Sequence, residues 1–237
     1  MDVREYLKSN IIVFDGAMGT MLQKKGLQAG DLPECLSITH PETVLEIHRE
    51  YVLAGADIVT TNTFQACELK LEGSGYSVEE IVNAGVSLAK KSGARYTALD
   101  IGPTGQLLEP MGTLSFDKAY ELFKRQMIAG EKAGADLILI ETMSDLYEMK
   151  AAILAAKENT DLPVFATMTY QEDGRTFTGT DPLTGTITLQ SLGADAVGVN
   201  CSMGPEELMP VVDQILEYSI VPVMVQANAG LPKIREG

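Results

Sequence analysis

Basic residues are scarce in this sequence, which has 18 Lys and Arg residues against 33 Asp and Glu residues and a formal net charge of −15. No basic run offers the patch of positive charge that a nucleic-acid backbone requires. The composition therefore argues against nucleic acid as a partner.

Cysteine and long apolar runs are scarce as well. Three cysteines, an odd number at the widely spaced positions 35, 67 and 201, argue against a disulfide framework and for a reducing compartment. The amino terminus is charged and lacks the apolar core of a signal peptide, and apolar runs such as Leu137 to Ile140 are far too short to span a bilayer. We therefore expect a soluble, cytoplasmic protein with no membrane partner.

A short motif recurs along the chain and indicates its organisation. Gly-Ala-Asp stands before an apolar run at Gly55, Gly134 and Gly193, and a looser copy, Gly-Ala-Arg, begins at Gly93. Glycine is typical of the residue that follows a helix, because it reaches the left-handed conformation without strain. The apolar runs are predicted strands, and a spacing of about forty residues fits one strand plus one helix.

Seven strands are predicted, at residues 11–15, 57–61, 97–101, 136–141, 164–169, 196–200 and 221–226. Helices are expected from Pro41 to just before Gly55, and near 116–132 after Ser115 as the N-terminal cap. A further helix should begin at Pro205, with a kink or a late start caused by Pro210.

Strict alternation of strands and helices predicts an α/β fold, a (β/α)8 TIM-type barrel that is incomplete, with seven of its eight strands present. No linker or low-complexity tract divides the chain. We expect one barrel domain over residues 1–237, truncated at the C-terminal end because too few residues follow the seventh strand for a helix and a strand. Another copy of the chain, in a homo-oligomer, or a C-terminal partner is expected to cover the open barrel edges.

Polar residues stand at the carboxyl ends of the predicted strands, where α/β barrels collect their catalytic groups. The set is Asp15, Thr61 with Asn62, Asp100, Glu141, Thr169, Asn200 with Cys201, and Gln226 with Asn228. Carboxylates suit an ammonium group, and the turn from Gly16 to Thr20 offers backbone N–H groups for a carboxylate. Together they predict a pocket for an amino acid, with Cys201 as a nucleophilic or metal-binding sulfur.

Six segments of the chain, in order, resemble the homocysteine S-methyltransferase family. They are Val13 to Thr20 (VFDGAMGT), Thr60 to Phe64 (TTNTF), Gly102 to Gly105 with Leu108 to Pro110 (GPTG and LEP), Glu141-Thr142, Gly198 to Cys201 (GVNC) and Ala227 to Pro232 (ANAGLP). GPTG and ANAGLP favour the branch formed by the amino-terminal, homocysteine-binding domains of cobalamin-dependent methionine synthases. The resemblance covers essentially the whole chain.

The resemblance implies a methyltransferase domain that converts homocysteine to methionine. Asp15 and Glu141 match the family's acids that bind the homocysteine ammonium group, and Asn62 and Asn200 are expected to orient backbone or substrate groups. Cys201 matches the first of three cysteine ligands of a zinc ion that activates the substrate thiol, which makes it the expected catalytic and metal-binding residue. The residues whose backbone amides would take the substrate carboxylate are Gly16, Ala17, Met18, Gly19 and Thr20.

Zinc and cobalamin are the cofactors that the resemblance implies. The other two zinc ligands of the family are an adjacent pair in a Gly-Gly-Cys-Cys motif; this chain ends before that point, and neither Cys35 nor Cys67 matches the pair. One thiolate does not make the three-ligand site typical of catalytic zinc, so we expect little tight zinc binding and no methyl transfer by the chain alone. Methylcobalamin would be supplied by a corrinoid-binding domain or protein.

Other interpretations stay open. A non-catalytic amino-acid-binding or assembly subunit that lost its metal site would bind homocysteine without metal or turnover. A different barrel enzyme, such as an aldolase or a phosphate-binding isomerase, is disfavoured because no lysine stands at a strand end and the eighth-strand phosphate site is missing. Taken singly, Cys201 also fits a small buried hydrophobe, Asp15 a turn former and Glu141 a residue near a helix start.

Overall fold

A parallel β-sheet forms the centre of the computed structural model, which describes residues 2–27 and 30–229. Each neighbouring pair of strands is parallel, and the order in the sheet follows the order in the chain. The strands are β1 (Ile58–Thr60), β2 (Tyr96–Ile101), β3 (Leu137–Met143), β4 (Val164–Met168), β5 (Ala196–Asn200) and β6 (Val223–Gln226).

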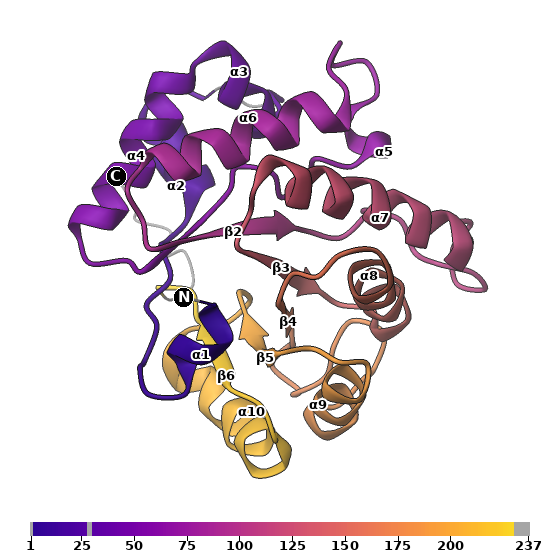
Figure 1. Cartoon of the computed structure of the whole chain (residues 1–237). Coiled ribbons are helices and arrows are strands. Elements are labelled where there is room, and N and C mark those ends of the chain that lie inside the picture. Colours follow the sequence, from indigo (N-terminus) through magenta and orange to yellow (C-terminus); the bar gives the residue numbers. More distant parts are fainter. Residues whose placement is uncertain (1, 28–29, 230–237) are drawn as a thin grey trace, which may run out of the picture.

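Helices alternate with these strands and cover the outer side of the curved sheet (Figure 1). The longer ones are α4 (Pro41–Leu53), α6 (Val78–Lys91), α7 (Phe116–Ala133), α8 (Leu146–Asn159), α9 (Pro182–Ser191) and α10 (Pro205–Tyr218). The shorter ones are α1 (Val3–Leu7), α2 (Met18–Lys24), the 3-10 helix η1 (Pro33–Cys35), α3 (Leu36–Thr39) and α5 (Glu68–Leu71). This arrangement confirms the prediction of an incomplete TIM-type α/β barrel.

The first predicted strand, at residues 11–15, is wrong in extent. Phe14 makes a single parallel bridge with Ile58, supported by hydrogen bonds from Asp15 N to Ile58 O (3.0 Å) and from Ile58 N to Val13 O (3.2 Å). Pairing stops there, and Ile11 is 91% exposed. Among the described residues this segment pairs on one side only, which leaves too few hydrogen bonds for a full strand. Within residues 2–27 and 30–229 the sheet therefore has six strands rather than the seven predicted.

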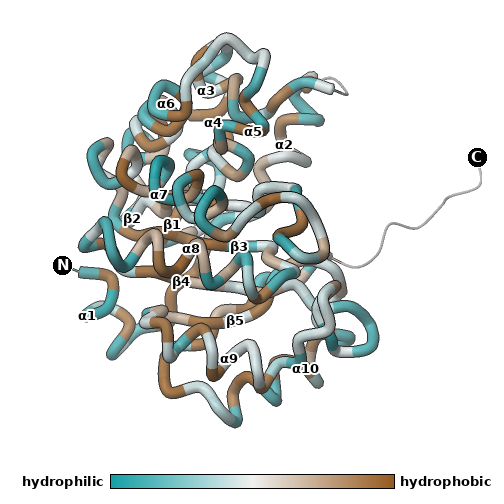
Figure 2. The backbone as a smooth tube through the Cα atoms, turned by 90° about the vertical axis from the view of Figure 1, so that its right-hand side faces the viewer, coloured by the Kyte–Doolittle hydropathy of each residue, from teal (hydrophilic) through white to brown (hydrophobic). Residues whose placement is uncertain are grey.

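Alternation along the strands divides the core into two layers. In β3, Leu137 and Leu139 face the barrel interior, whereas Ile138 and Ile140 pack under the helices. Val3 of α1 joins the interior cluster, because this helix lies against one end of the barrel. Figure 2 shows the result: the strands at the centre are mostly apolar, and the helices around them carry more polar residues. Side chains two residues apart therefore share a face, which decides what lies at the strand ends.

The Gly-Ala-Asp motif links each helix to the next strand as predicted. The glycines at 55, 93, 134 and 193 have φ between 90° and 106°, the left-handed conformation expected after a helix. The aspartates add a contact that the sequence analysis did not predict, since each carboxylate accepts a hydrogen bond from a backbone N–H of the preceding strand segment. The bonds are Val13 N to Asp57 (3.1 Å), Thr97 N to Asp136 (2.8 Å) and Val164 N to Asp195 (2.8 Å).

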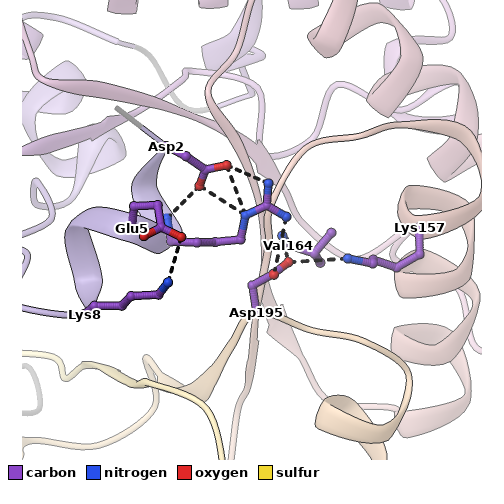
Figure 3. A network of polar contacts seen from close by, with 7 residues as sticks. Asp2, Glu5, Lys8, Lys157, Val164 and Asp195 are labelled. Carbon is purple, nitrogen blue, oxygen red and sulfur yellow. Dashed lines mark hydrogen bonds and ion pairs between the residues drawn. The ribbon is translucent and has the colours of Figure 1, made fainter.

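Asp195 also lies in a network of charges (Figure 3). Its carboxylate is 3.4 Å from Nζ of Lys157 and 3.8 Å from Nη1 of Arg4, and Arg4 in turn pairs with Asp2. The network ties α1 and α8 to the start of β5. It lies at the amino ends of the strands, the end of the barrel opposite to the polar strand ends.

Most helix predictions are confirmed, with one correction. The helix at Pro41 ends at Leu53, and Ser115 caps α7 through a hydrogen bond from Lys118 N. Of the two outcomes predicted at Pro210, the late start is wrong, because α10 begins at Pro205 and includes Pro210 in its second turn, and the kink stays a prediction. No helix in the described ranges is long and apolar enough to cross a membrane. Residues 230–232 of the ANAGLP segment lie outside the described residues.

Candidate functional site

A pocket of about 750 Å³ contains the carboxyl ends of the strands. It continues through the barrel interior between β6 and the segment before β1, where Phe165 and Met224 line it. Its polar lining includes residues from five strand ends and the segments next to them: Asp15, Thr60, Asp100, Glu141, Asn200, Cys201 and Gln226, together with Asn10 and Asn228. No Lys, Arg or His belongs to this lining as far as the structure describes the chain, so the pocket is acidic.

Strand alternation explains which polar residues reach the pocket. The interior cluster includes Ile58, Ala98, Leu139, Ala196 and Met224. Counting forward in steps of two from these residues leads to the pocket-lining set Thr60, Asp100, Glu141, Asn200 and Gln226. The site is thus the last inward-facing layer of the barrel, in which polar side chains replace apolar ones.

Asn200 is the centre of the hydrogen-bond network in the site. Its Nδ2 donates to Oε2 of Glu141 and to Oγ1 of Thr142, both at 2.8 Å. Its Oδ1 accepts from Thr142 N (2.9 Å) and from Oγ1 of Thr167 (2.9 Å). Asn200 is 1% exposed, so these bonds are shielded from water and fix the position of the Glu141 carboxyl group.

Backbone strain accumulates beside this network. Thr142, Cys201 and Ser202 are the non-glycine residues with positive φ in the described ranges, at 60°, 60° and 63°. The β3–β4 pairing is also irregular between Ile140 and Met143. Each left-handed non-glycine residue costs on the order of 1–3 kcal/mol, and irregularities of this kind gather where a side chain must be re-aimed toward a site.

Asp15 is held by Thr60 of β1. Its Oδ2 accepts from Thr60 N (2.9 Å) and its Oδ1 from Oγ1 of Thr60 (3.0 Å). Burial raises the pKa of Asp15 to about 7, against the lowering effect of the two Thr60 bonds and with a further contribution from Glu141. The carboxyl group is therefore close to half protonated at neutral pH, which is unusual for aspartate.

Asp100 and Glu141 form a coupled acidic pair. Burial raises the pKa of Asp100 well above its ordinary value, and the nearby Glu141 raises it further. Burial also raises the pKa of Glu141, while a hydrogen bond from Asp100 lowers it. The two carboxyl groups therefore share one proton, with Asp100 as the donor of the hydrogen bond and Glu141 as its acceptor. Asp100 was predicted to lie at a strand end, without an assigned role.

The predicted turn at residues 16–20 lies only partly in the pocket. Gly16, Ala17 and Met18 line it, whereas Gly19 and Thr20 do not. Gly16 is required by close packing, because a Cβ there would lie 2.8 Å from the ring of Tyr51, whose hydroxyl donates to Ala17 O (3.1 Å).

Asn62 also lies outside the pocket lining. Its Nδ2 donates to Pro33 O (2.7 Å) and to Oγ of Ser37 (3.2 Å), so it orients the backbone of the η1–α3 segment. Asn62 was predicted because it follows the end of the apolar run, but β1 ends at Thr60, so Asn62 lies in the loop beyond the strand, where alternation no longer sets the direction of its side chain.

Cys201 lies in the pocket with Asn200 Nδ2 at 3.3 Å and Thr142 Oγ1 at 3.9 Å from its sulfur. Burial raises the pKa of the Cys201 thiol, so it is protonated at neutral pH. Cys35 and Cys67 are free and belong to η1 and the start of α5. No three His, Cys, Asp or Glu side chains converge to hold a metal ion within residues 2–27 and 30–229, so the described residues do not fit a three-ligand zinc site.

The curved parallel sheet, its outer helices and the polar pocket at the strand ends define a TIM-type (β/α) barrel protein. A model of the homocysteine S-methyltransferase family matches residues 12–237, and the chain therefore belongs to that family.

Methionine synthases are similar to the chain in sequence. Those of Mycobacterium tuberculosis and Mycobacterium leprae are each 31% identical over 253 residues, with 98% of this chain and 21% of the relative covered. The chain thus spans about a fifth of the length of these relatives.

Solved structures show the same fold. The homocysteine methyltransferase MmuM from Escherichia coli, in its metallated form, matches with a TM-score of 0.86 and 22% identity, covering 96% of this chain and 87% of that one. The carboxyl transferase domain of Rhizobium etli pyruvate carboxylase matches with a TM-score of 0.58 and 15% identity, covering 94% and 36%.

Proposed function

We propose that this chain is a homocysteine S-methyltransferase domain whose pocket binds the amino-acid end of homocysteine. The observation that carries the proposal is the placement of Asp15 and Glu141 in one pocket without a Lys or Arg in its described lining. Carboxyl groups removed from water need a positive counter-charge, and an ammonium group supplies it. Family membership and the similarity to methionine synthases support homocysteine as the amino acid.

The remaining groups give the substrate an orientation. Its carboxylate would lie against the backbone of Gly16 to Met18, where α2 begins without a side-chain cap and its first N–H groups have no partner within the helix. Its thiol would lie toward Cys201, on the side of the pocket formed by β5. Asn200 holds Glu141 in place for the ammonium group.

Zinc and methylcobalamin belong to the proposal through the family resemblance. Cys201 alone gives one thiol in the pocket, and its raised thiol pKa does not favour the thiolate. We assign no step to a metal on these residues. Methyl transfer would need further metal ligands and a methyl donor on a corrinoid-binding domain or protein. The single thiol favours a second candidate, an amino-acid-binding subunit without turnover.

Isothermal titration of the purified chain with L-homocysteine, under reducing conditions, tests the binding proposal. We expect the chain to bind, and we expect Glu141→Gln to weaken binding about tenfold or more, because it removes a charged hydrogen-bond acceptor. Glu206→Gln, an exposed change in the first turn of α10, is the matched control and should leave the affinity unchanged. A chain that does not bind homocysteine, or equal affinities for E141Q and the unmodified chain, contradicts the proposal.

Zinc content, measured together with methyl transfer from methylcobalamin, separates the two candidates. Homocysteine binding with little zinc and no transfer favours the binding subunit. Zinc near one ion per chain together with methyl transfer would show that Cys201 acquires further ligands, and it would support the methyltransferase for this molecule.

A further inference from the structure

Asp100 lines the acidic pocket and has a fixed backbone. It is the last inward-facing residue of β2, between β1 and β3, and it is 7% exposed. Its backbone N–H donates to Oγ1 of Thr61 (3.0 Å), and its carbonyl accepts from Oγ1 of Thr63 (2.8 Å). These bonds are buried, so the direction of the Asp100 side chain is set by the sheet.

The Asp100 side chain has unused hydrogen-bonding capacity. Its Oδ1 is buried and has no hydrogen-bond partner among the described residues. Oε1 of Gln226, on β6 in the same pocket, is also buried and also has no hydrogen-bond partner among the described residues. Both atoms are acceptors, and burying an acceptor without a donor costs free energy. A pocket with two such atoms is suited to a ligand group that carries several N–H donors.

We propose that Asp100 is a third carboxyl group of the amino-acid site, whose free Oδ1 accepts a hydrogen bond from the substrate's ammonium group beside Glu141. This inference rests on the proposed function and deepens it. The geometry that carries it is the shared pocket, the adjacent strands and the unpartnered buried oxygen. An ammonium group has three N–H donors, so Asp100, Glu141 and Asp15 can each accept one of them.

The proposal also predicts a change in protonation when the substrate binds. The ionisable groups that face Asp100 are Glu141 on β3, Asp15 before β1 and Glu34 in η1, all of them acids. In the free site the proton on Asp100 keeps two neighbouring carboxyl groups from ionising together. When the ammonium group enters with its own positive charge, that proton leaves to solvent, and no covalent bond of the substrate changes. Substrate binding therefore releases a proton that Asp100 held.

The test compares two ligands that differ in the ammonium group alone: L-homocysteine and 4-mercaptobutanoate, which lacks it. Asp100→Asn should weaken homocysteine binding about 10- to 100-fold, the range expected for a hydrogen bond to a charged group. The same variant should leave the weak affinity for 4-mercaptobutanoate unchanged. Titration at pH 8, where Asp15 is already mostly ionised, in buffers of different ionisation enthalpy should show proton release for the unmodified chain and much less for D100N.

Glu34→Gln is the matched control. Glu34 is also buried, at 2% exposure, and its Oε2 is also unpartnered, but it does not line the pocket. Glu34 is also the weakest of the three acids that raise the pKa of Asp100, so E34Q should keep the homocysteine affinity and most of the proton release of the unmodified chain. Thermal unfolding of D100N, which should fold because the change removes a buried acid, shows whether a loss of affinity has a structural origin.

The outcomes separate this inference from the proposed function. Equal homocysteine affinities for D100N and the unmodified chain overturn the inference and leave the proposed function standing. An equal loss for both ligands assigns Asp100 a merely structural role and also overturns it. Absence of homocysteine binding by the unmodified chain contradicts the proposed function and the inference together.

Discussion

At the scale of the single residue, Asp15 has opposite effects on stability and on binding: its buried carboxyl group destabilises the folded chain when charged, but it is proposed to bind the substrate's ammonium group. Its folded-state pKa of about 7 lies above the model-compound value of 3.8. The folded chain therefore binds more protons than the unfolded chain between these two pH values, and its stability falls as the pH rises through this window. Above pH 7 Asp15 is charged in an acidic pocket that holds Glu141 and Asp100.

Asp15→Asn should accordingly stabilise the free chain and weaken its binding of homocysteine. At pH 8 we expect the free energy of unfolding to rise by up to roughly 4 kcal/mol, and the difference should shrink toward zero at pH 4. Homocysteine binding should be weakened at both pH values. Denaturant unfolding at the two pH values measures the first effect, and calorimetric titration measures the second.

Asp213→Asn, an exposed change on α10, is the control for the Asp15 variant and should alter neither quantity. If D15N were no more stable than the unmodified chain at pH 8, burial would not be what raises the pKa of Asp15. If D15N bound homocysteine normally, Asp15 would not contact the ammonium group.

The aspartates of the repeated motif show how elements are held in register. Asp195 accepts a hydrogen bond from Val164 N at the start of β4 and lies beside Lys157 at the end of α8. Asp57 and Asp136 make the equivalent backbone contacts in their own repeats. A motif of three residues therefore ends one helix, begins one strand and joins that strand to the previous one.

Asp195→Ala should lower the free energy of unfolding by about 1–3 kcal/mol, because it leaves the Val164 N–H without its acceptor. Asp195→Asn keeps an acceptor oxygen and loses only the charge, so it should cost less, since ion pairs with partly exposed lysines contribute little. Urea unfolding of the three chains gives the comparison. Equal losses for D195A and D195N would mean that the charge, rather than the backbone contact, matters.

Side chains alternate between the two faces of each strand, and this alternation can be read from the sequence. The choice of polar residues at the strand ends did not use it. Glu141 and Asn200 line the pocket because each lies at a strand end and on the inward face. Asn62 lies in the loop two residues beyond the end of β1 and does not line the pocket, whereas Thr60, the last residue of β1, lines it and was not predicted. A count in steps of two from the buried interior residues finds Thr60 and would have drawn attention to Asp100.

The sequence predicted the class of fold and the order of its elements because both follow from local patterns. Glycine caps, apolar strand runs and helix starts such as Pro205 depend on near neighbours. The extent of the first strand and the proton shared by Asp100 and Glu141 depend on contacts between distant segments, and a single sequence does not show these. The hydrogen bonds of Asn200 to β3 and β4 also join segments that are distant in the sequence, so the sequence alone does not predict them.

At the scale of the whole molecule, the curved sheet brings five strand ends into one pocket. In the described part of the chain β6 pairs with β5 alone, and the pocket extends along that edge toward residues 10–14. Ile11 and Ile220, near the two edges, are 91% and 85% exposed. The expectation that another copy of the chain or another chain covers these edges stays a prediction.

A crystal structure of the chain with bound L-homocysteine tests the central claim most directly. The account predicts the ammonium nitrogen within hydrogen-bond distance of the carboxyl oxygens of Asp15, Asp100 and Glu141, the carboxylate against the backbone of Gly16 to Met18, and the thiol toward Cys201. Homocysteine bound in the reverse orientation, or outside this pocket, would contradict it.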